Sequence, residues 1–545
     1  MKSRILQILM AYTACVLSVV AQTPPGAPED NGLIPKSDTI YINVPPVSPN
    51  NGNTESLGVA IGQNGNVLVG WEDDGDGFFD TESIWTMFNS SGVSITPDTP
   101  QSSLDPAYAG QSVTNRFLSY FRKDGSATPG ISSWGPKIKA NPFSDGFGMG
   151  ATSYGLGTEV PEFAAIQTQA DGSEGDFPSV QLLTKDGQSV GIVAGVDDAY
   201  ADRDGDIRIG DWEYLSNGNI VIVGESRQDQ DLIDVYGGSA PGHQAIYRIV
   251  GPTGNVVKAV SLVSATPDPV QIWHGVGVTS NGFAVRFDLA GAQVRMFDNS
   301  GNPTSANIDL AALTGHLIAG GGGRGDGTGF HGNGKDAYVA VSAGTDDQGN
   351  KAVWVTVLNA SGTLRYSTNA TAGMTLVGPG RVDAAIDANG RVLAVFADAD
   401  ASGTGAYSYL IGGRLLDATG TPTASPFYVS EAELPSNSLL LLQNPRVAWR
   451  GDLAAIVWES KNNPATPDRV VAMRLFNTSV VGVPALTATR SGSELILSWP
   501  TSATGFTLES TGALPASSWT TVGGVVNNSV TNTIGPGNKF YRLRK

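Results

Sequence analysis

The sequence predicts an all-β protein, and three observations lead to this prediction. The chain has 69 glycines and 31 prolines among 545 residues, and only 15% of its residues are charged, a composition typical of turn-rich β structure. Apolar and polar residues alternate over short segments, as they do in half-buried strands. These segments recur with similar turns between them, so we expect a repeat array larger than one ordinary domain.

Each repeat begins with two strands joined by a glycine turn. The pattern is visible in GQNGNVLVGWED, LSNGNIVIVGES, TSNGFAVRFD, DANGRVLAVFAD and WRGDLAAIVWES. The Asn-Gly pair favours the left-handed backbone of a tight hairpin. A second hairpin follows in FNSSGVS, LTKDGQS, VGPTGNV, FDNSGNP, LNASGTL and LDATGTP. Each repeat therefore holds four strands, here called A to D.

The spacing of the A–B turns sets the number of repeats. The turn glycines are Gly65, Gly218, Gly282, Gly334, Gly390 and Gly451. The long interval between the first two leaves room for one irregular repeat, with its B strand expected in EFAAIQTQAD (162–171) and its C strand in PSVQLLTKDG (178–187). Seven four-stranded repeats predict a seven-bladed β-propeller over residues 38–480. An array of β-sandwich repeats is the alternative.

The two ends of the repeat region favour a closed ring. The last repeat ends after its C strand, VVAMRLF (470–476), with no fourth strand behind it. Near the other end, TIYINVPP (39–46) has strand character and belongs to no repeat. We expect this segment to supply the missing D strand, because the pairing covers two open edges at once.

The N-terminal segment is typical of a secretory signal peptide. Lys2 and Arg4 precede an apolar stretch, and small residues stand before Gln22. We therefore expect a signal peptide over 1–21, a linker over 22–37, and a protein that is secreted or at the cell surface. A membrane anchor is the alternative, but nothing downstream resembles a membrane span. Cys15, the one cysteine, lies within this segment, so no disulfide is expected in the mature chain.

Residues 484–545 are expected to form a small β-sandwich. The segments ELILSWP, GFTLESTGAL and FYRL resemble the fibronectin-type-III-like modules that end many secreted bacterial proteins. That resemblance implies display or attachment. The repeat region resembles the repeat β-propellers of secreted bacterial proteins, a resemblance that carries no specific activity.

The acidic loops between strands B and C and between strands D and A are candidate Ca²⁺ sites. In ADRDGDIRIGDWE the carboxylates Asp202, Asp204, Asp206 and Glu213 alternate in the manner of a calcium loop. In EDDGDGFFDTE they are Glu72, Asp74, Asp76 and Asp80. The alternative is that these residues form solvated turns. The net charge of -18 is unsuited to nucleic acid and favours divalent cations.

The same face carries candidate ligand-binding residues, namely Trp212, Trp273, His274, His243 and Glu225. Aromatic rings beside carboxylates suit a sugar, and a histidine beside a carboxylate suits acid–base chemistry. The alternative is that the aromatic rings pack between blades. No catalytic residues are identified by spacing.

These features predict a secreted, non-enzymatic propeller that binds a polysaccharide or cell-surface ligand through its acidic, calcium-binding face. The alternative is a carbohydrate-active enzyme, a polysaccharide lyase or glycoside hydrolase, acting at that face.

Overall fold

The computed structural model confirms the all-β prediction: the part of the chain that it describes is almost entirely strands, with one short helix, α3 (Leu310–Thr314). The described residues are 32–42, 55–74, 81–96, 115–116, 118–121, 127–129, 132–154, 176–194, 207–226, 244–265, 272–289, 291–316, 329–374, 376, 379–399, 409–423, 426–429, 441–461, 470–478, 486–499, 506–513 and 518–544. Within these ranges no helix is long and apolar enough to cross a membrane.

Six four-stranded antiparallel sheets follow one another along the described chain. Sheet 1 has β3 (Glu55–Ile61), β4 (Val67–Asp74), β5 (Thr81–Phe88) and β6 (Asn115–Arg116), and sheet 2 has β9 (Ser132–Ala140), β10 (Phe147–Tyr154), β11 (Asp176–Leu183) and β12 (Ser189–Ala194). Sheet 3 has β13 (Ile207–Tyr214), β14 (Ile220–Ser226), β15 (Gln244–Val250) and β16 (Val256–Leu262), and sheet 4 has β17 (Ile272–Thr279), β18 (Gly282–Asp288), β19 (Ala292–Asp298) and β20 (Ile308–Asp309). Sheet 5 has β21 (Phe330–Gly332), β22 (Ala337–Thr345), β23 (Lys351–Asn359) and β24 (Leu364–Asn369), and sheet 6 has β25 (Pro379–Ile386), β26 (Val392–Ala399), β27 (Tyr409–Leu416) and β28 (Phe427–Tyr428).

Sheet 7 is completed by residues from the other end of the repeat region. Its strands are β29 (Leu441–Arg450), β30 (Leu453–Lys461) and β31 (Val470–Asn477), and both β1 (Ile34–Pro35) and β2 (Ile40–Tyr41) pair with β31. Ile40 lies opposite Met473, and Ile42 N donates a hydrogen bond to Val471 O (2.8 Å). The predicted pairing of 39–46 is confirmed for residues 40–42, and residues 43–46 lie outside the described residues. Because β1 also pairs, sheet 7 begins within the predicted linker and before the predicted boundary at residue 38.

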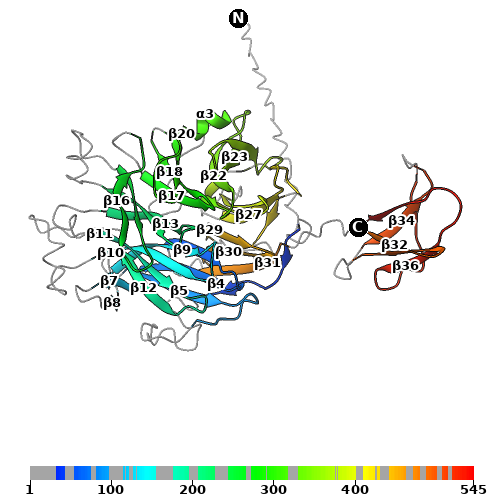
Figure 1. Cartoon of the computed structure of the whole chain (residues 1–545), viewed down its shortest axis with the longest axis horizontal. Coiled ribbons are helices and arrows are strands. Elements are labelled where there is room, and N and C mark those ends of the chain that lie inside the picture. The colour runs from blue at the N-terminus through cyan, green and yellow to red at the C-terminus, as the bar shows by residue number, and fades with distance from the viewer. Residues whose placement is uncertain are drawn as a thin grey trace, which may run out of the picture.

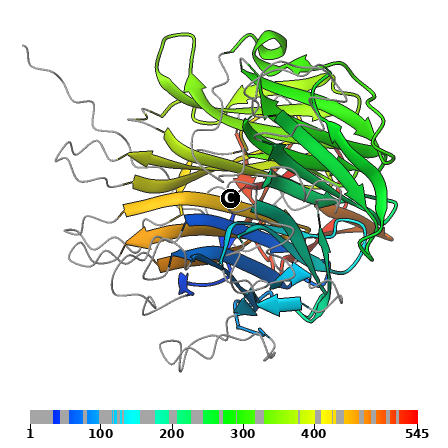
Figure 2. The same ribbon diagram turned by 90° about the vertical axis from the view of Figure 1, so that its left-hand side faces the viewer.

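The seven sheets close into a β-propeller-like ring (Figure 1). A separate hydrophobic cluster lies between each pair of neighbouring sheets, including one between sheet 7 and sheet 1. Figure 2 shows the blue strands of sheet 1 beside the orange strands of sheet 7. The innermost strands β3, β9, β13, β17, β21, β25 and β29 contact one another in this order, and β29 contacts β3.

The glycine turns between strands C and D form as predicted, and side chains fix them. In the turn after β19, Gly301 has φ 77°, which favours glycine. Asp298 Oδ1 accepts hydrogen bonds from Ser300 N and Asn302 N, both 2.8 Å long. The same arrangement recurs at Asp417, whose carboxylate accepts from Thr419 N and Thr421 N. An acidic residue at the start of such a turn is therefore explained by local structure.

The predicted B strand of the irregular repeat was wrong. The second strand of sheet 2 is β10, which reads FGMGATSY and pairs with both β9 and β11, whereas EFAAIQTQAD (162–171) lies outside the described residues. The glycines of β10 conceal its strand character in the sequence, yet packing requires one of them: a side chain at Gly148 would collide with the ring of Trp212. The predicted C strand is confirmed as β11.

The C-terminal segment contains two three-stranded sheets. One holds β32 (Thr487–Ser491), β33 (Glu494–Ser498) and β36 (Ser529–Thr533), and the other holds β34 (Thr507–Thr511), β35 (Thr520–Thr521) and β37 (Phe540–Arg544). Both sheets contribute to one small core around Leu497, Trp499, Leu508 and Val530. A short pair, β7 (Leu118–Phe121) and β8 (Ala127–Pro129), stands between sheets 1 and 2 in the chain.

Candidate functional site

The innermost strands surround a pocket of about 250 Å³ near the A–B turns. All seven of these strands contribute lining residues, so the pocket is the end of the ring's central channel. A second cavity, of about 60 Å³, shares Lys139 and His331 with the pocket and includes Asp211, Asp383 and Arg446. Charged side chains therefore line a channel whose walls are otherwise formed mainly by apolar strand residues.

Two matching polar links join the innermost strands. In the first, Lys139 Nζ donates a hydrogen bond to Asp211 Oδ2 (3.0 Å), which also accepts from Val276 N (2.9 Å). This link connects sheets 2, 3 and 4. The second, matching link begins at His331.

In the second link, His331 Nε2 lies 2.8 Å from Asp383 Oδ1, and Asp383 Oδ2 accepts from Val447 N (3.0 Å). It connects sheets 5, 6 and 7. Both aspartates stand four residues before the first residue of their A–B turn, and Lys139 and His331 stand two residues before theirs. The same arrangement of an aspartate between a cationic or imidazole side chain and a backbone N–H therefore occurs twice, once in each half of the ring.

The local charges stabilise both links. Burial opposes the charge of Lys139, but Asp211 and Glu213 outweigh it and raise the pKa of Lys139 above its usual range. Burial likewise opposes the charge of Asp383, but His331, Arg446 and the Val447 amide together lower its pKa. In each link, neighbouring groups therefore stabilise a buried charge, that of Lys139 or of Asp383, which burial alone would disfavour.

The first link also includes the carboxyl group of Glu213, and the second link has no corresponding carboxyl group. Glu213 follows Asp211 by two residues on β13, so both side chains face the channel. Its Oε1 lies 3.4 Å from Lys139 Nζ, whereas its Oε2 is buried and has no hydrogen-bond partner among the described residues. Burial raises the pKa of Glu213 to about 7, against the opposing effect of Lys139. The matching position in sheet 6 is Ala385, so this kind of link does not require a carboxyl group there.

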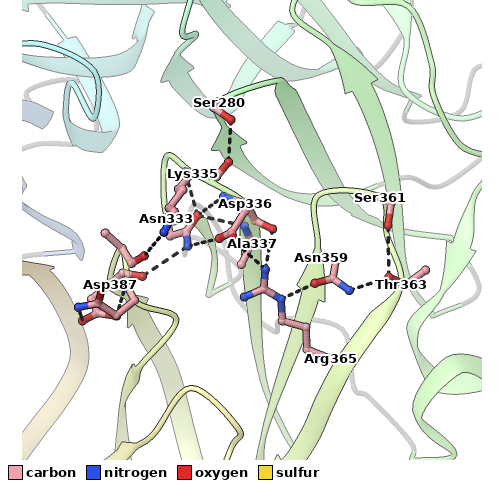
Figure 3. Close-up of polar contacts among 12 residues, drawn as sticks. Ser280, Asn333, Lys335, Asp336, Ala337, Asn359, Ser361, Thr363, Arg365 and Asp387 are labelled. Carbon is pink, nitrogen blue, oxygen red and sulfur yellow. Dashed lines mark hydrogen bonds and ion pairs between the residues drawn. The ribbon is translucent and has the colours of Figure 1, made fainter.

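Hydrogen bonds join the A–B turns of sheets 4, 5 and 6 into a partial rim beside the pocket, and Figure 3 shows these bonds. Ser280 Oγ of sheet 4 donates to Lys335 O of sheet 5 (2.9 Å), and Asn333 Nδ2 reaches Asp387 O of sheet 6 (3.5 Å). Asn333 Oδ1 also accepts from the backbone N–H groups of Lys335, Asp336 and Ala337, which fixes the turn. The rim residues are therefore held in place before any ligand arrives.

The A–B turn of sheet 2, residues 141–146, reaches turns of several other sheets; we call it the cross-turn. Arg450 of sheet 7 donates hydrogen bonds to Asn141 O (3.1 Å) and Pro142 O (3.2 Å). A Cβ at Gly334 of sheet 5 would lie 2.9 Å from Pro142 Cβ. Phe143 packs on the core between sheets 3 and 4. The cross-turn consequently covers part of the channel end, with Arg450 and Pro142 in the pocket wall.

The sequence-predicted ligand residues occupy several different environments. Trp212 is 0% exposed, and its Nε1 donates to Lys137 O (2.8 Å) in the core between sheets 2 and 3. His274 is also buried, against Gly210 of the neighbouring strand. Trp273 and Glu225 lie on β17 and β14, where only the backbone is described, and His243 lies outside the described residues. The structure therefore does not bring Trp212 to the surface as an aromatic platform.

Of the predicted calcium ligands, Glu213 lies in the channel beside Lys139. Glu72 and Asp74 belong to β4, and Asp202, Asp204, Asp206, Asp76 and Asp80 lie outside the described residues. Among the residues that are described, no three His, Cys, Asp or Glu side chains are grouped so as to hold a metal ion.

The channel residues Lys139, Asp211, His331, Asp383 and Arg450 were not identified from the sequence. Each is a single polar residue near the end of an inner strand, so no local motif marks it. Four of them share their positions in pairs: Lys139 and His331 stand two residues before their A–B turns, and Asp211 and Asp383 stand four before theirs. This signal becomes visible only once the repeats are aligned on those turns, and Arg450 does not share it.

No protein-family model matches the chain, and no curated protein matches it. Among solved structures, a protein of unknown function from Dyadobacter fermentans is similar at 12% identity and TM-score 0.41, covering 82% of this chain and 99% of its own. The polysaccharide lyase Uly1 is similar at 11% identity and TM-score 0.42, covering 81% of this chain and 94% of its own. The α-L-arabinofuranosidase Arb93A from Fusarium graminearum is similar at 8% identity and TM-score 0.38, covering 82% of this chain and 99% of its own.

Proposed function

We propose that the seven sheets are the blades of a seven-bladed β-propeller, and that the protein is a carbohydrate-active enzyme whose acid–base group is Glu213. One observation carries this proposal. Glu213 is a carboxyl group in the pocket wall whose pKa burial raises to about 7, and the matching position of the second link holds Ala385. A carboxyl group exchanges protons best near its pKa, so Glu213 suits general acid–base catalysis near neutral pH.

The pocket wall supports a sugar as the ligand. It includes Asn333 and the charged groups of Lys139 and Arg450. A sugar presents many hydroxyl groups that polar and charged side chains bind. Trp449 also borders the pocket, but its indole lies in the core between sheets 6 and 7 and donates to Thr478 Oγ1 (2.7 Å). The volume of about 250 Å³ is just below the roughly 300–1,000 Å³ typical of small-molecule sites, so the pocket suits one sugar unit.

Asp211 and Glu213 have different roles in the proposed site. Asp211 Oδ2 is occupied by Lys139 Nζ and Val276 N, and its Oδ1 accepts from Trp212 N (2.9 Å). It is therefore a positioning residue, which holds Lys139 beside Glu213. The carboxyl group of Glu213, whose Oε2 has no hydrogen-bond partner among the described residues, gives or takes the proton. The same proton transfer serves protonation of a glycosidic oxygen in hydrolysis and in elimination by a lyase.

The remaining expectations stand as part of this proposal. The segment 1–21 directs export, and residues 484–545 form a fibronectin-type-III-like module for attachment or display. Ca²⁺ binds the loop that holds Asp202, Asp204 and Asp206. Glu213 is not among its ligands, because Lys139 holds it in the channel.

A turnover screen on a panel of polysaccharides and oligosaccharides tests the function. We expect the intact protein to cleave at least one of them and Glu213→Gln to lose that cleavage while it still binds. Glu494→Gln, on an exposed residue of β33, is the matched control and should cleave normally. Binding without turnover by the intact protein would support the non-enzymatic alternative instead.

A further inference from the structure

Arg450 is a pocket cation whose hydrogen-bond partners are neutral. It stands at the end of β29, and it lines the same pocket as Glu213. Its guanidinium donates to Asn141 O and Pro142 O. Gln63, oriented with its amide oxygen toward Arg450 Nη2, adds a third neutral acceptor at 3.1 Å. These contacts fix the guanidinium in the pocket wall. Within the described structure Arg450 forms no direct ion pair, and Asp145 acts on its charge only through space.

Two carboxylates in the surroundings of Arg450, those of Asp387 and Asp145, are already paired or exposed. Asp387 lines the pocket, but its Oδ2 pairs with Arg391 Nε (2.8 Å). Asp145 belongs to the exposed part of the cross-turn and, within the described structure, forms no ion pair with Arg450. Burial lowers the pKa of Arg450, with Asp145 opposing this effect only through space. A half-buried guanidinium of this kind is stabilised by an anion brought in from solution.

We propose that Arg450 binds the carboxylate of an acidic sugar, a uronate, in the channel pocket. This inference rests on the proposed function, since it names the substrate class of the same site. A guanidinium donates charge-assisted hydrogen bonds to carboxylate oxygens. Nη1 bonds to Asn141 O, and Nη2 bonds to Pro142 O and Gln63, so the Nε proton and one Nη1 proton of Arg450 remain. These two protons lie on opposite sides of the guanidinium, so the contact to a carboxylate is a single charge-assisted hydrogen bond.

The rest of the pocket is consistent with this assignment. Lys139 and His331 add further positive or polar character to the wall, while Glu213 is partly protonated near neutral pH. The carboxyl group that would most repel a bound uronate therefore carries less than a full negative charge. A neutral sugar would leave the charge of Arg450 uncompensated.

The test compares two ligands that differ only in charge. Binding of sodium D-glucuronate and of neutral D-glucuronamide to the full chain is measured by calorimetry at pH 7. We expect the intact protein to prefer glucuronate by roughly ten- to a hundredfold, the range for one charge-assisted hydrogen-bonded contact. Arg450→Gln should abolish that preference, and Arg450→Lys should retain part of it. Because both ligands are measured on each variant, a general loosening of the site cancels from the ratio.

A second variant separates the charge of Arg450 from the fold of the cross-turn. Asn141→Ala removes the hydrogen bonds from Phe143 N and Ser144 N to Asn141 Oδ1 but keeps the cation. It should keep the preference for glucuronate within about threefold. Equal ligand ratios in Arg450→Gln and the intact protein, or equal losses in Asn141→Ala and Arg450→Gln, would overturn the proposal. Tighter binding of glucose 6-sulfate than of glucuronate would show that the anion is a sulfate ester and contradict the carboxylate assignment.

Glu213→Gln distinguishes this inference from the proposed function. It should prefer glucuronate at least as strongly as the intact protein does, because the partial negative charge of Glu213 is removed, and yet lose turnover. If the Glu213→Gln protein still cleaves the substrate, the acid–base proposal is wrong, whereas the proposed anion site at Arg450 is unaffected. Loss of the preference only in Arg450→Gln would support the anion site whatever the outcome for turnover.

Discussion

Lys139 of β9 and Asp211 of β13 join the innermost strands of adjacent sheets, with 3.0 Å between Nζ and Oδ2. Asp211 extends the connection to the backbone of β17, and His331 and Asp383 repeat it in the other half of the ring. The links add polar contacts between neighbouring inner strands that also contact one another directly. Buried charges of this kind are costly when one partner is lost.

Removal of Asp211 should therefore destabilise the ring. Asp211→Ala leaves Lys139 buried without its closest partner and Val276 N without an acceptor, so we expect a loss of about 3–5 kcal/mol in the free energy of unfolding. Urea unfolding measures it. Lys185→Ala, which breaks only the exposed pair of Lys185 with Asp186, is the control and should change little. Similar small effects for both variants would contradict a stabilising role for the link.

Ring closure depends on the residues that flank β1 and β2. Leu33 is buried in the core between sheets 6 and 7, whereas the next residue, Ile34, is 41% exposed. Leu33→Ala should cost about 2–5 kcal/mol, the usual range for a buried leucine, and Ile34→Ala much less. Chemical denaturation followed by tryptophan fluorescence compares the two. If the costs are equal, the segment does not close the ring as described.

The stability of the protein should depend on pH through Glu213. Burial raises its pKa from 4.5 to about 7, so between these values the folded protein binds the proton more tightly than the unfolded chain does. The contribution of Glu213 to the free energy of unfolding should thus fall as pH rises from about 4.5 to about 7 and stay constant above. The fall is on the order of 3 kcal/mol. Glu213→Gln should remove this component, which urea titrations at pH 4.5, 6 and 7.5 measure; parallel curves for the two proteins would exclude it.

Calcium binding should not involve the channel. We expect weak binding, with a dissociation constant of roughly 10⁻⁴ to 10⁻³ M, at the loop of Asp202, Asp204 and Asp206. Calorimetry should show that Asp204→Ala with Asp206→Ala removes the binding heat. Glu213→Gln should leave it unchanged, because Lys139 holds Glu213 in the channel. Identical heats in the intact protein and the double variant would leave the loop as an acidic turn.

The sequence predicts the strands and turns better than the site, for physical reasons. Asn-Gly and Asp-containing hairpins depend on local backbone preferences, so the turns at Gly218 and Gly301 are readable from a few residues. The strand β10 was missed because Gly148 serves contact with Trp212, a residue of another sheet. The links between Lys139 and Asp211 and between His331 and Asp383 join residues of different repeats, so only the closed ring brings them together. Glu213 was singled out, but as a metal ligand, since the sequence does not show that Lys139 lies beside it.

The central claim is that Glu213 is the acid–base group of a carbohydrate-active site, and the pH dependence of turnover tests it most directly. With the substrate found by the screen, kcat/KM of the intact protein should change around pH 7, the value to which burial raises the pKa of Glu213. Glu213→Gln should lower kcat/KM by roughly 10²- to 10⁴-fold and lose the transition near pH 7. A Glu213→Gln protein that keeps both the rate and the pH profile of the intact protein would contradict the claim.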